Sequence, residues 1–132
     1  MNALGNWSLG LEVLKERLAV CRLSPESPVP TWAMGPASFC SITRTAEELS
    51  IVCPVGAVPE GTPFEGPWRA LKVQGPLDFA WVGILAALSA CLARAGVSLF
   101  ALSTFDTDYL LVKAEDLPAA LSALGQDGHR IG

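Results

Sequence analysis

The chain has 132 residues, of which 51% are hydrophobic and 17% are charged. This length suits one compact domain or two very small ones that share a core, and the composition argues against a disordered chain. The formal net charge is −4, and the nine basic residues are scattered singly along the sequence. We therefore expect no nucleic-acid partner, because phosphate backbones are bound by clustered Lys and Arg side chains.

The sequence predicts neither export nor a membrane partner. The start, MNALGNWSLG, has no basic segment followed by an apolar run, so we expect no signal peptide and a cytoplasmic protein. The longest uncharged apolar stretch, residues 79–93, is too short to span a bilayer comfortably and predicts a buried helix.

The cysteines favour neither zinc nor disulfides. They have no CxxC spacing, and the single histidine, His129, lies next to the end of the chain. We expect reduced, partly buried thiols, no metal site and no cofactor. The four cysteines are Cys21, Cys40, Cys53 and Cys91.

The second half of the chain alternates strands and helices. Residues 69–74 alternate polar and apolar side chains as a half-buried strand does, and Gly75-Pro76 ends the run. Asp78 is a plausible N-cap for an apolar, Leu- and Ala-rich helix that begins near residues 77–79 and stops at Gly96.

A hairpin, a helix and a short strand follow. Residues 97–104 and 107–113 predict two strands, and a helix with Pro118 in its first turn runs from residue 115 or 116 to Gly125. Residues 129–131 predict a last strand. The order β-α-β-β-α-β is that of the ferredoxin-like unit, and the fold class is α+β.

The first half repeats this order in a weaker form. Residues 16–23 predict a strand, and the Pro-rich passage after it leaves room for one short helical turn at most. A hairpin follows, with its turn near Ala46-Glu47, and then a loop or reduced helix before Trp68. We interpret the chain as two tandem units: residues 9–66, the first, with reduced helices, and residues 67–132, the second and complete.

Three passages carry a family resemblance. VSLFALSTFDTDYLLVKAEDLPAAL (97–121) resembles the hairpin and second helix of ACT domains, the amino-acid-binding regulatory modules of aspartate kinases and related enzymes. It is most similar to small tandem-ACT proteins that include the cytosolic arginine sensors of animals, with Ala114 as a visible departure. SFCSITRTAEELSIVC (38–53) and LDFAWVGILAAL (77–88) resemble the first hairpin and the loop and helix start of this subgroup.

The resemblance implies a ligand site and a homodimer. Amino acids bound to ACT domains usually sit where the first loop and helix start of one unit face the hairpin of another. The positions that match the subgroup's ligand contacts are Asp78, Trp81, Val82, Gly83, Ile84, Leu85 and Asp108, with Val97 and Ser98 from the facing unit. We add Thr104, which lies in the same hairpin as Asp108, to the expected ligand-binding residues.

These residue types suit a free amino acid. The unpaired amides at a helix start bind a carboxylate, and Asp108 or Asp106 with hairpin carbonyls can bind an ammonium group. Where the arginine sensors carry an acidic residue, this chain carries Trp81. We therefore expect a smaller or apolar amino acid rather than arginine.

Each residue also has a purely structural interpretation. Asp106 and Asp108 are common turn residues, Asp78 can act only as a helix cap, and Trp81 can fill a core or a dimer interface. The sequence leaves these alternatives open.

Three functional classes remain for this chain. A non-catalytic amino-acid sensor that regulates an unidentified protein target fits best, and a ligand-free oligomerisation or interaction module is the alternative. A small enzyme is the weakest of the three, because the sequence contains no phosphate-binding GxGxxG or GxxxxGK motif and offers one imidazole, His129.

Overall fold

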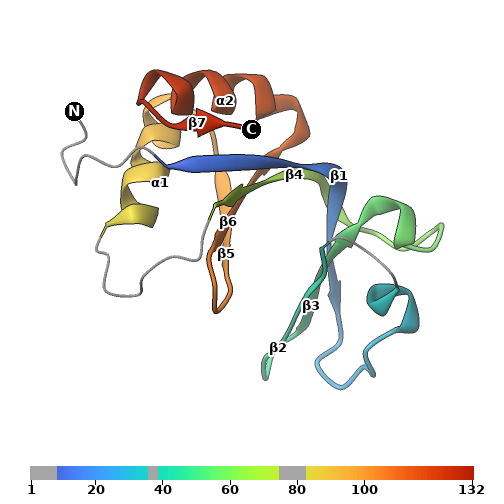
Figure 1. The fold of residues 1–132 in the computed structure, drawn as a ribbon. Helices are drawn as coiled ribbons and strands as arrows, with labels where there is room; N and C mark the ends of the chain where they lie inside the picture. The colour runs from blue at the N-terminus through green and yellow to red at the C-terminus, as the bar shows by residue number, and fades with distance from the viewer. Residues whose placement is uncertain (1–8, 36–38, 75–82) are drawn as a thin grey trace. The chain divides into compact units, whose positions relative to one another are not determined.

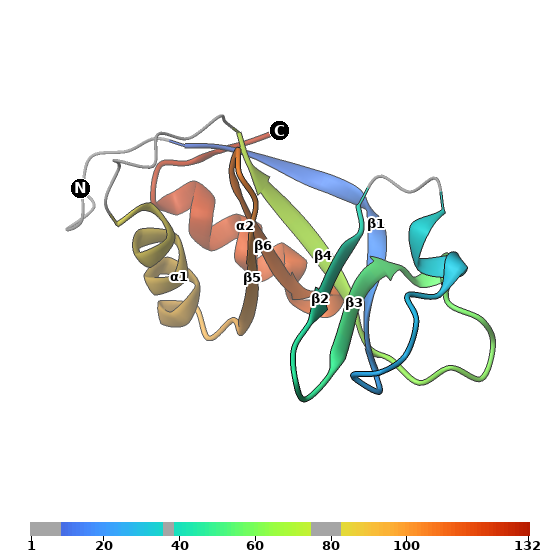
Figure 2. The ribbon, with the colours of Figure 1, turned by 90° about the horizontal axis from the view of Figure 1, so that it is seen from below.

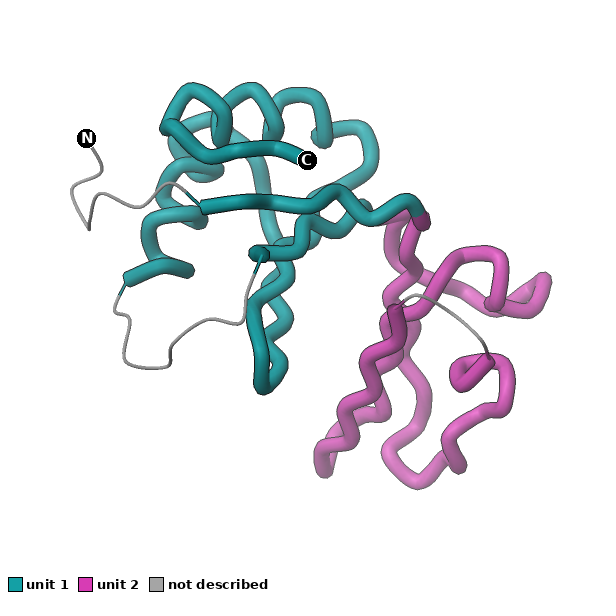
Figure 3. Tube along the Cα trace, in the orientation of Figure 1, with its two compact units in different colours: residues 1–15, 69–132 teal, residues 16–68 magenta. Residues whose placement is uncertain are grey.

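The structure is a computed structural model that describes residues 9–35, 39–74 and 83–132. By its contacts the chain separates into two compact units, which Figure 3 colours separately. Unit 1 comprises residues 1–15 and 69–132, and unit 2 comprises residues 16–68. Residues 9–15, which we expected in the first unit, thus belong by contact to the body that holds the second.

Unit 1 contains every element predicted for the second half of the chain, in the predicted order. Its strands are β4 (Glu65–Val73, shared with unit 2), β5 (Leu99–Ser103), β6 (Asp108–Lys113) and β7 (Arg130–Ile131). Its helices are α1 (Ile84–Arg94) and α2 (Leu117–Gln126), the latter preceded by the 3-10 turn η3 (Ala114–Asp116). The α+β class is confirmed, and helix α1 begins at Ile84, several residues after the predicted start.

The sheet of unit 1 contains a strand that the sequence did not place there. The N-terminal part of β1 (Gly10–Leu23) lies between β7 and β4, so the order is β7-β1-β4-β6-β5. It pairs in parallel with β7, Gly10 opposite Arg130 and Leu11 opposite Ile131, and the Gln74 amide donates to the Gly10 carbonyl over 2.8 Å. The four-stranded unit predicted from the sequence is therefore opened by a fifth strand from the other end of the chain.

One face of this sheet carries the core of unit 1. The helices α1 and α2 pack against each other and against that face (Figures 1 and 2). Burial of these apolar side chains is the main stabilising contribution, at about 25 cal/mol per Å² of apolar surface. The core includes Leu11, Leu71, Val73, Leu88, Leu92, Leu110, Val112 and Leu124, each with no exposed surface.

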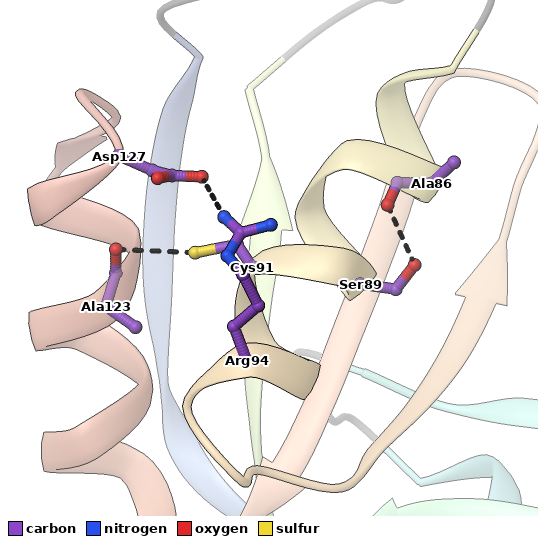
Figure 4. Close-up of polar contacts among 6 residues, drawn as sticks. All are labelled: Ala86, Ser89, Cys91, Arg94, Ala123 and Asp127. Atoms are coloured by element: carbon purple, nitrogen blue, oxygen red, sulfur yellow. Dashed lines mark hydrogen bonds and ion pairs between the residues drawn. The ribbon is translucent and has the colours of Figure 1, made fainter. Parts of the chain in front are cut away.

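The C-terminal ends of the two helices are also joined by polar contacts. Figure 4 shows the Arg94 guanidinium on α1 bound to the Asp127 carboxylate beyond α2, at 3.0 Å. The Cys91 thiol donates to the Ala123 carbonyl, at 3.3 Å. The ion pair is largely exposed and contributes little, so apolar packing holds the helices together.

Unit 2 is smaller and has no α-helix among its described residues. The remaining part of β1 pairs antiparallel with β3 (Leu49–Pro54), and β3 pairs antiparallel with β2 (Ser41–Arg44). Two 3-10 turns, η1 (Thr31–Met34) and η2 (Val55–Ala57), stand where unit 1 has helices. The expected single short turn in the Pro-rich passage is confirmed, and η1 packs on a core that includes Ala19, Cys21, Leu49, Ile51 and Cys53.

The two hairpins close with the same turn. In each, a threonine amide donates to the carbonyl three residues later, Thr45 to Glu48 over 2.9 Å and Thr104 to Thr107 over 2.8 Å. Each threonine hydroxyl also accepts the amide of that third residue, over 3.2 and 3.3 Å. A 3-10 turn follows each hairpin, and these turns start at Val55 and Ala114. The same number of residues separates these two starts as separates Thr45 from Thr104, so the two hairpins are related by one constant spacing.

The two ends of the described chain are held by a buried histidine. His129 is 5% exposed, and its Nδ1 accepts the Leu9 amide over 3.2 Å, just before β1 and β7 pair. Burial lowers the pKa of His129, and the neighbouring Asp127 opposes this in part. The neutral imidazole is therefore the form that the folded chain stabilises.

Within the described residues, no helix combines the length and the apolar character needed to cross a membrane.

We expect the free energy of unfolding to fall as the pH drops below about 6.5, the ordinary pKa of histidine. The unfolded chain binds a proton on His129 at a higher pH than the folded chain does, so this stability is complete above that pH and is lost below it. Urea unfolding at a series of pH values between about 7.5 and 5.5 measures the slope. The variant His129→Gln keeps a hydrogen-bond acceptor that does not titrate, so its free energy of unfolding should depend less on pH. An equal slope in both proteins would contradict the role of His129 in this pH dependence.

Candidate functional site

Three chain segments lie at the same end of unit 1. The chain runs along β4, returns along α1 and runs again along β5, so the end of β4, the start of α1 and the β5–β6 turn lie at the same end (Figures 1 and 2). The described contacts place the turn directly beside the last residue of β4. This end of unit 1, which we call the loop end, is the region where the sequence predicts the ligand.

Thr107 attaches the turn to the sheet. Its hydroxyl donates to the Val73 carbonyl over 2.6 Å, and its side chain is 4% exposed. A buried hydroxyl needs such a partner, because leaving it unpaired costs about 1–3 kcal/mol. Strand alternation points Thr107 and Asp108 to opposite faces of the sheet, and the contact with Val73 gives Thr107 a structural role.

Asp108 lies on the face of the sheet that the helices cover. It is the first residue of β6, and the core residues Leu110 and Val112 follow it at alternate positions on the same face. It is paired in register with Ser103, whose hydroxyl donates to the Asp108 carboxylate over 2.7 Å. A half-buried carboxylate with one hydroxyl donor retains further acceptor positions for a cation.

The start of α1 supplies amide donors at this end. Gly83 caps the helix with φ +84°, in the left-handed region that glycine adopts without strain, and the Ala87 amide makes the first bond of the helix, to the Gly83 carbonyl over 2.8 Å. The preceding amides of residues 84–86 have no acceptor within the helix, as at every helix start. Ile84 is buried in the core and Leu85 packs against it, so their main chain is what they offer a ligand.

The remaining predicted residues are separated from this group or outside the described residues. Val97 is buried in the core and Ser98 is exposed, and both precede β5, whereas Asp108 follows the turn at its other end. Within one copy of unit 1, the five residues of β5 separate them from Asp108 by about 17 Å. Asp78, Trp81 and Val82 lie outside the described residues.

Ser103 and Thr104 both make local hydrogen bonds within the hairpin. The Thr104 hydroxyl donates to the Thr107 carbonyl over 3.1 Å, in addition to accepting the Thr107 amide. Thr104 is therefore committed to the turn, whereas Asp106 in the same turn is exposed.

Two cavities are lined by residues that do not belong to the loop end. One of about 180 Å³ lies between the C-terminal ends of α1 and α2, beside the contacts of Figure 4. The other, of about 260 Å³, lies in unit 2 and is lined by apolar residues with one carboxylate residue: Glu16, Trp32, Ala33, Gly35, Cys53, Pro54, Gly56 and Ala57.

The thiols are poorly suited to nucleophilic chemistry. Burial raises the pKa of all four cysteines, and it raises the pKa of Cys53 to about 11 together with the nearby Cys21 and Cys40. A reactive cysteine needs the opposite shift, because the thiolate is the nucleophile. His129 is occupied by the Leu9 amide, and the described residues contain no group of three or more His, Cys, Asp or Glu side chains arranged to hold a metal.

Comparison with known proteins agrees with this geometry. A family model described as the ACT domain matches residues 64–126, and a model of an N-terminal domain matches residues 16–61. A solved protein from Agrobacterium tumefaciens is 36% identical, with a TM-score of 0.88 over 96% of this chain and 94% of that one. The chain belongs to the ACT-domain family.

More distant solved structures share the fold of this ACT protein. A Vibrio cholerae protein of unknown function, described as a possible transport protein, is 20% identical, with a TM-score of 0.77 over 92% of this chain and 91% of that one. The regulatory subunit of aspartate kinase from Thermus thermophilus is 13% identical, with a TM-score of 0.60 over 87% of this chain and 96% of that one. No curated protein matches the sequence.

Sequence reasoning missed two sets of polar contacts in this ACT protein. It gave Ser103 no contact with Asp108. It also gave no role to Arg22, which binds the Glu47 carbonyl in the first hairpin turn, or to Arg44, which binds the Ser27 carbonyl in the loop after β1. The constant spacing between the two hairpins was present in the sequence, and it would have matched Arg44 with Ser103 and Leu49 with Asp108.

We expect Thr107→Val to lower the free energy of unfolding by about 1–2 kcal/mol, because it leaves the buried Val73 carbonyl without its donor. The exposed strand residue Thr43 offers a matched control, and Thr43→Val should change stability by less than about 0.5 kcal/mol. Urea unfolding monitored by tryptophan fluorescence measures both. Equal effects of the two variants would contradict the structural role of Thr107.

Proposed function

We propose that this ACT protein is a non-catalytic regulatory module that binds a free amino acid at the loop end of unit 1. The observation that carries the proposal is the position of Asp108, a half-buried carboxylate on the helix-covered face at the end where α1 begins. Membership of the ACT-domain family supports a regulatory, ligand-binding role, without naming the ligand.

The two halves of the site complement an α-amino acid. The amides of the first turn of α1 would bind the ligand carboxylate, where the helix dipole favours an anion. Asp108 would bind the ammonium group in a charge-assisted hydrogen bond, while Ser103 orients the carboxylate. Asp78, Trp81 and Val82 complete the proposed site, and Trp81 favours a small or apolar ligand over arginine.

A second copy of the chain would close the site. Val97 and Ser98 are too far from Asp108 to act within the same unit 1, so in this proposal their main-chain groups come from a facing unit in a homodimer. A ligand held between two copies shifts assembly by its differential affinity for the two states, which is the basis for ligand-dependent contact with a target protein.

The repeated turns support an origin of the chain from two tandem ACT-like units. One constant spacing relates the turn threonines, the turn-closing residues and the 3-10 turns after them to their counterparts. The strands that flank these turns follow one another in the same order in both units, and unit 2 has η1 and η2 where unit 1 has helices. We propose that residues 9–66 and 67–132 derive from such units, with β1 inserted into the sheet of the second.

A thermal-shift screen against the twenty standard amino acids tests the function. One or a few should raise the melting temperature in a concentration-dependent manner, since a ligand that binds the folded chain alone at about 100 times its Kd stabilises it by about 2.7 kcal/mol. Absence of any shift at millimolar concentration would contradict the proposal.

Two charge-removing variants then locate the site. Asp108→Asn should abolish the shift with little change in the melting temperature of the ligand-free protein. Asp106→Asn removes a carboxylate from the same turn at an exposed position and should keep the shift. An unchanged shift in Asp108→Asn would place the ligand elsewhere.

The second candidate is an assembly module that binds no ligand. It is favoured by β5, which lies at an edge of the described sheet, because an edge strand presents unpaired main-chain groups to another strand. Sedimentation at micromolar concentrations should then show a dimer whose population does not depend on amino acids. A monomer at every concentration would contradict this candidate.

A further inference from the structure

In unit 2, arginine side chains connect the hairpin with β1 and with the loop after β1. The Arg44 guanidinium donates to the Ser27 carbonyl over 2.8 Å and also to the Pro25 carbonyl. From β1, the Arg22 guanidinium donates to the Glu47 carbonyl in the turn, over 2.9 Å. The loop that accepts from Arg44 follows the first strand of unit 2, as residues 74–83 follow β4 in unit 1.

Arg44 occupies the position in unit 2 that Ser103 occupies in unit 1. Arg44 is paired in register with Leu49, and Ser103 is paired with Asp108, and both members of each pair keep the constant spacing of the two hairpins. Leu49 lies in the core that η1 covers, so its cross-strand partner Arg44 projects to that same face. In both units this is the face on which the proposed ammonium site lies.

The chemistry of the two positions is complementary. Unit 1 presents a carboxylate, Asp108, which needs a cation from outside, whereas unit 2 presents Leu49 at the equivalent position and cannot supply that acceptor. Unit 2 instead presents a cation of its own. The planar guanidinium has five donors, and it suits two main-chain carbonyls held close together.

We infer that Arg44 is a built-in substitute for the ligand, which closes the ammonium site of unit 2 and leaves the equivalent site of unit 1 open. This inference rests on the proposed function for its account of unit 1. Its own content is that unit 2 contains a seat for a guanidinium cation, formed by the Pro25 and Ser27 carbonyls and occupied by the side chain of Arg44.

Chemical rescue tests the seat without any amino-acid ligand. Arg44→Ala should lower the melting temperature by about 3–6 °C, because two charge-assisted hydrogen bonds are lost. Millimolar methylguanidinium should then restore at least half of that loss by binding the emptied seat. Arg17→Ala, which removes an exposed guanidinium from β1 in the same unit, is the matched control and should show no rescue.

Two results would overturn the inference. One is an unchanged melting temperature in Arg44→Ala; the other is a response of Arg44→Ala to methylguanidinium equal to those of the wild-type and Arg17→Ala proteins. These results do not depend on the amino-acid screen. A failed screen contradicts the proposed function, whereas the methylguanidinium experiment tests the guanidinium seat of unit 2 by itself. If the screen finds a ligand, calorimetry should give one per chain, and two per chain would overturn the closure of unit 2.

Discussion

The alternation of side chains along β6 is the constraint on which the site depends. Leu110 and Val112 are fully buried beneath the helices, and a strand that points them inward must point Asp108 to the same face. A shift of the register by one residue would turn both core residues away from the helices, so the same apolar burial that stabilises unit 1 determines where this carboxylate lies. The carboxylate is placed by the core, and its charge is not needed for that core.

The two hairpins show how one turn can serve two purposes. Both close through a threonine that accepts the amide of the third residue after it, and both lead through a strand into a 3-10 turn. In unit 1 the position before the turn threonine is a serine that supports a carboxylate. In unit 2 it is an arginine that reaches the loop after the first strand. The two equivalent cross-strand pairs therefore carry opposite charges, on Asp108 in unit 1 and on Arg44 in unit 2. In the proposed function, this difference separates a site that binds a cation from one that contains it.

Most of the local structure could be predicted from the sequence. The hairpins, the second helix, the short last strand and the reduced helices of the Pro-rich half follow from patterns that act over a few residues. The start of the first helix was predicted several residues early, because the apolar run continues through residues 79–83 while the described helix begins after Gly83. Asp108 was identified through the family resemblance, but its pairing with Ser103 came from the register of the strands.

The sequence by itself determined the order of the strands and helices and the ACT-like character of the second half, since alternation, glycine and proline act within short stretches of chain. Only the tertiary structure decided that β1 lies between β7 and β4 and that His129 accepts the Leu9 amide 120 positions away. The same holds for the contact of Arg44 with the Ser27 carbonyl in the loop after β1. These contacts depend on which distant strands pair and in what register. That choice is made by the burial of the whole core and leaves no mark in any local pattern.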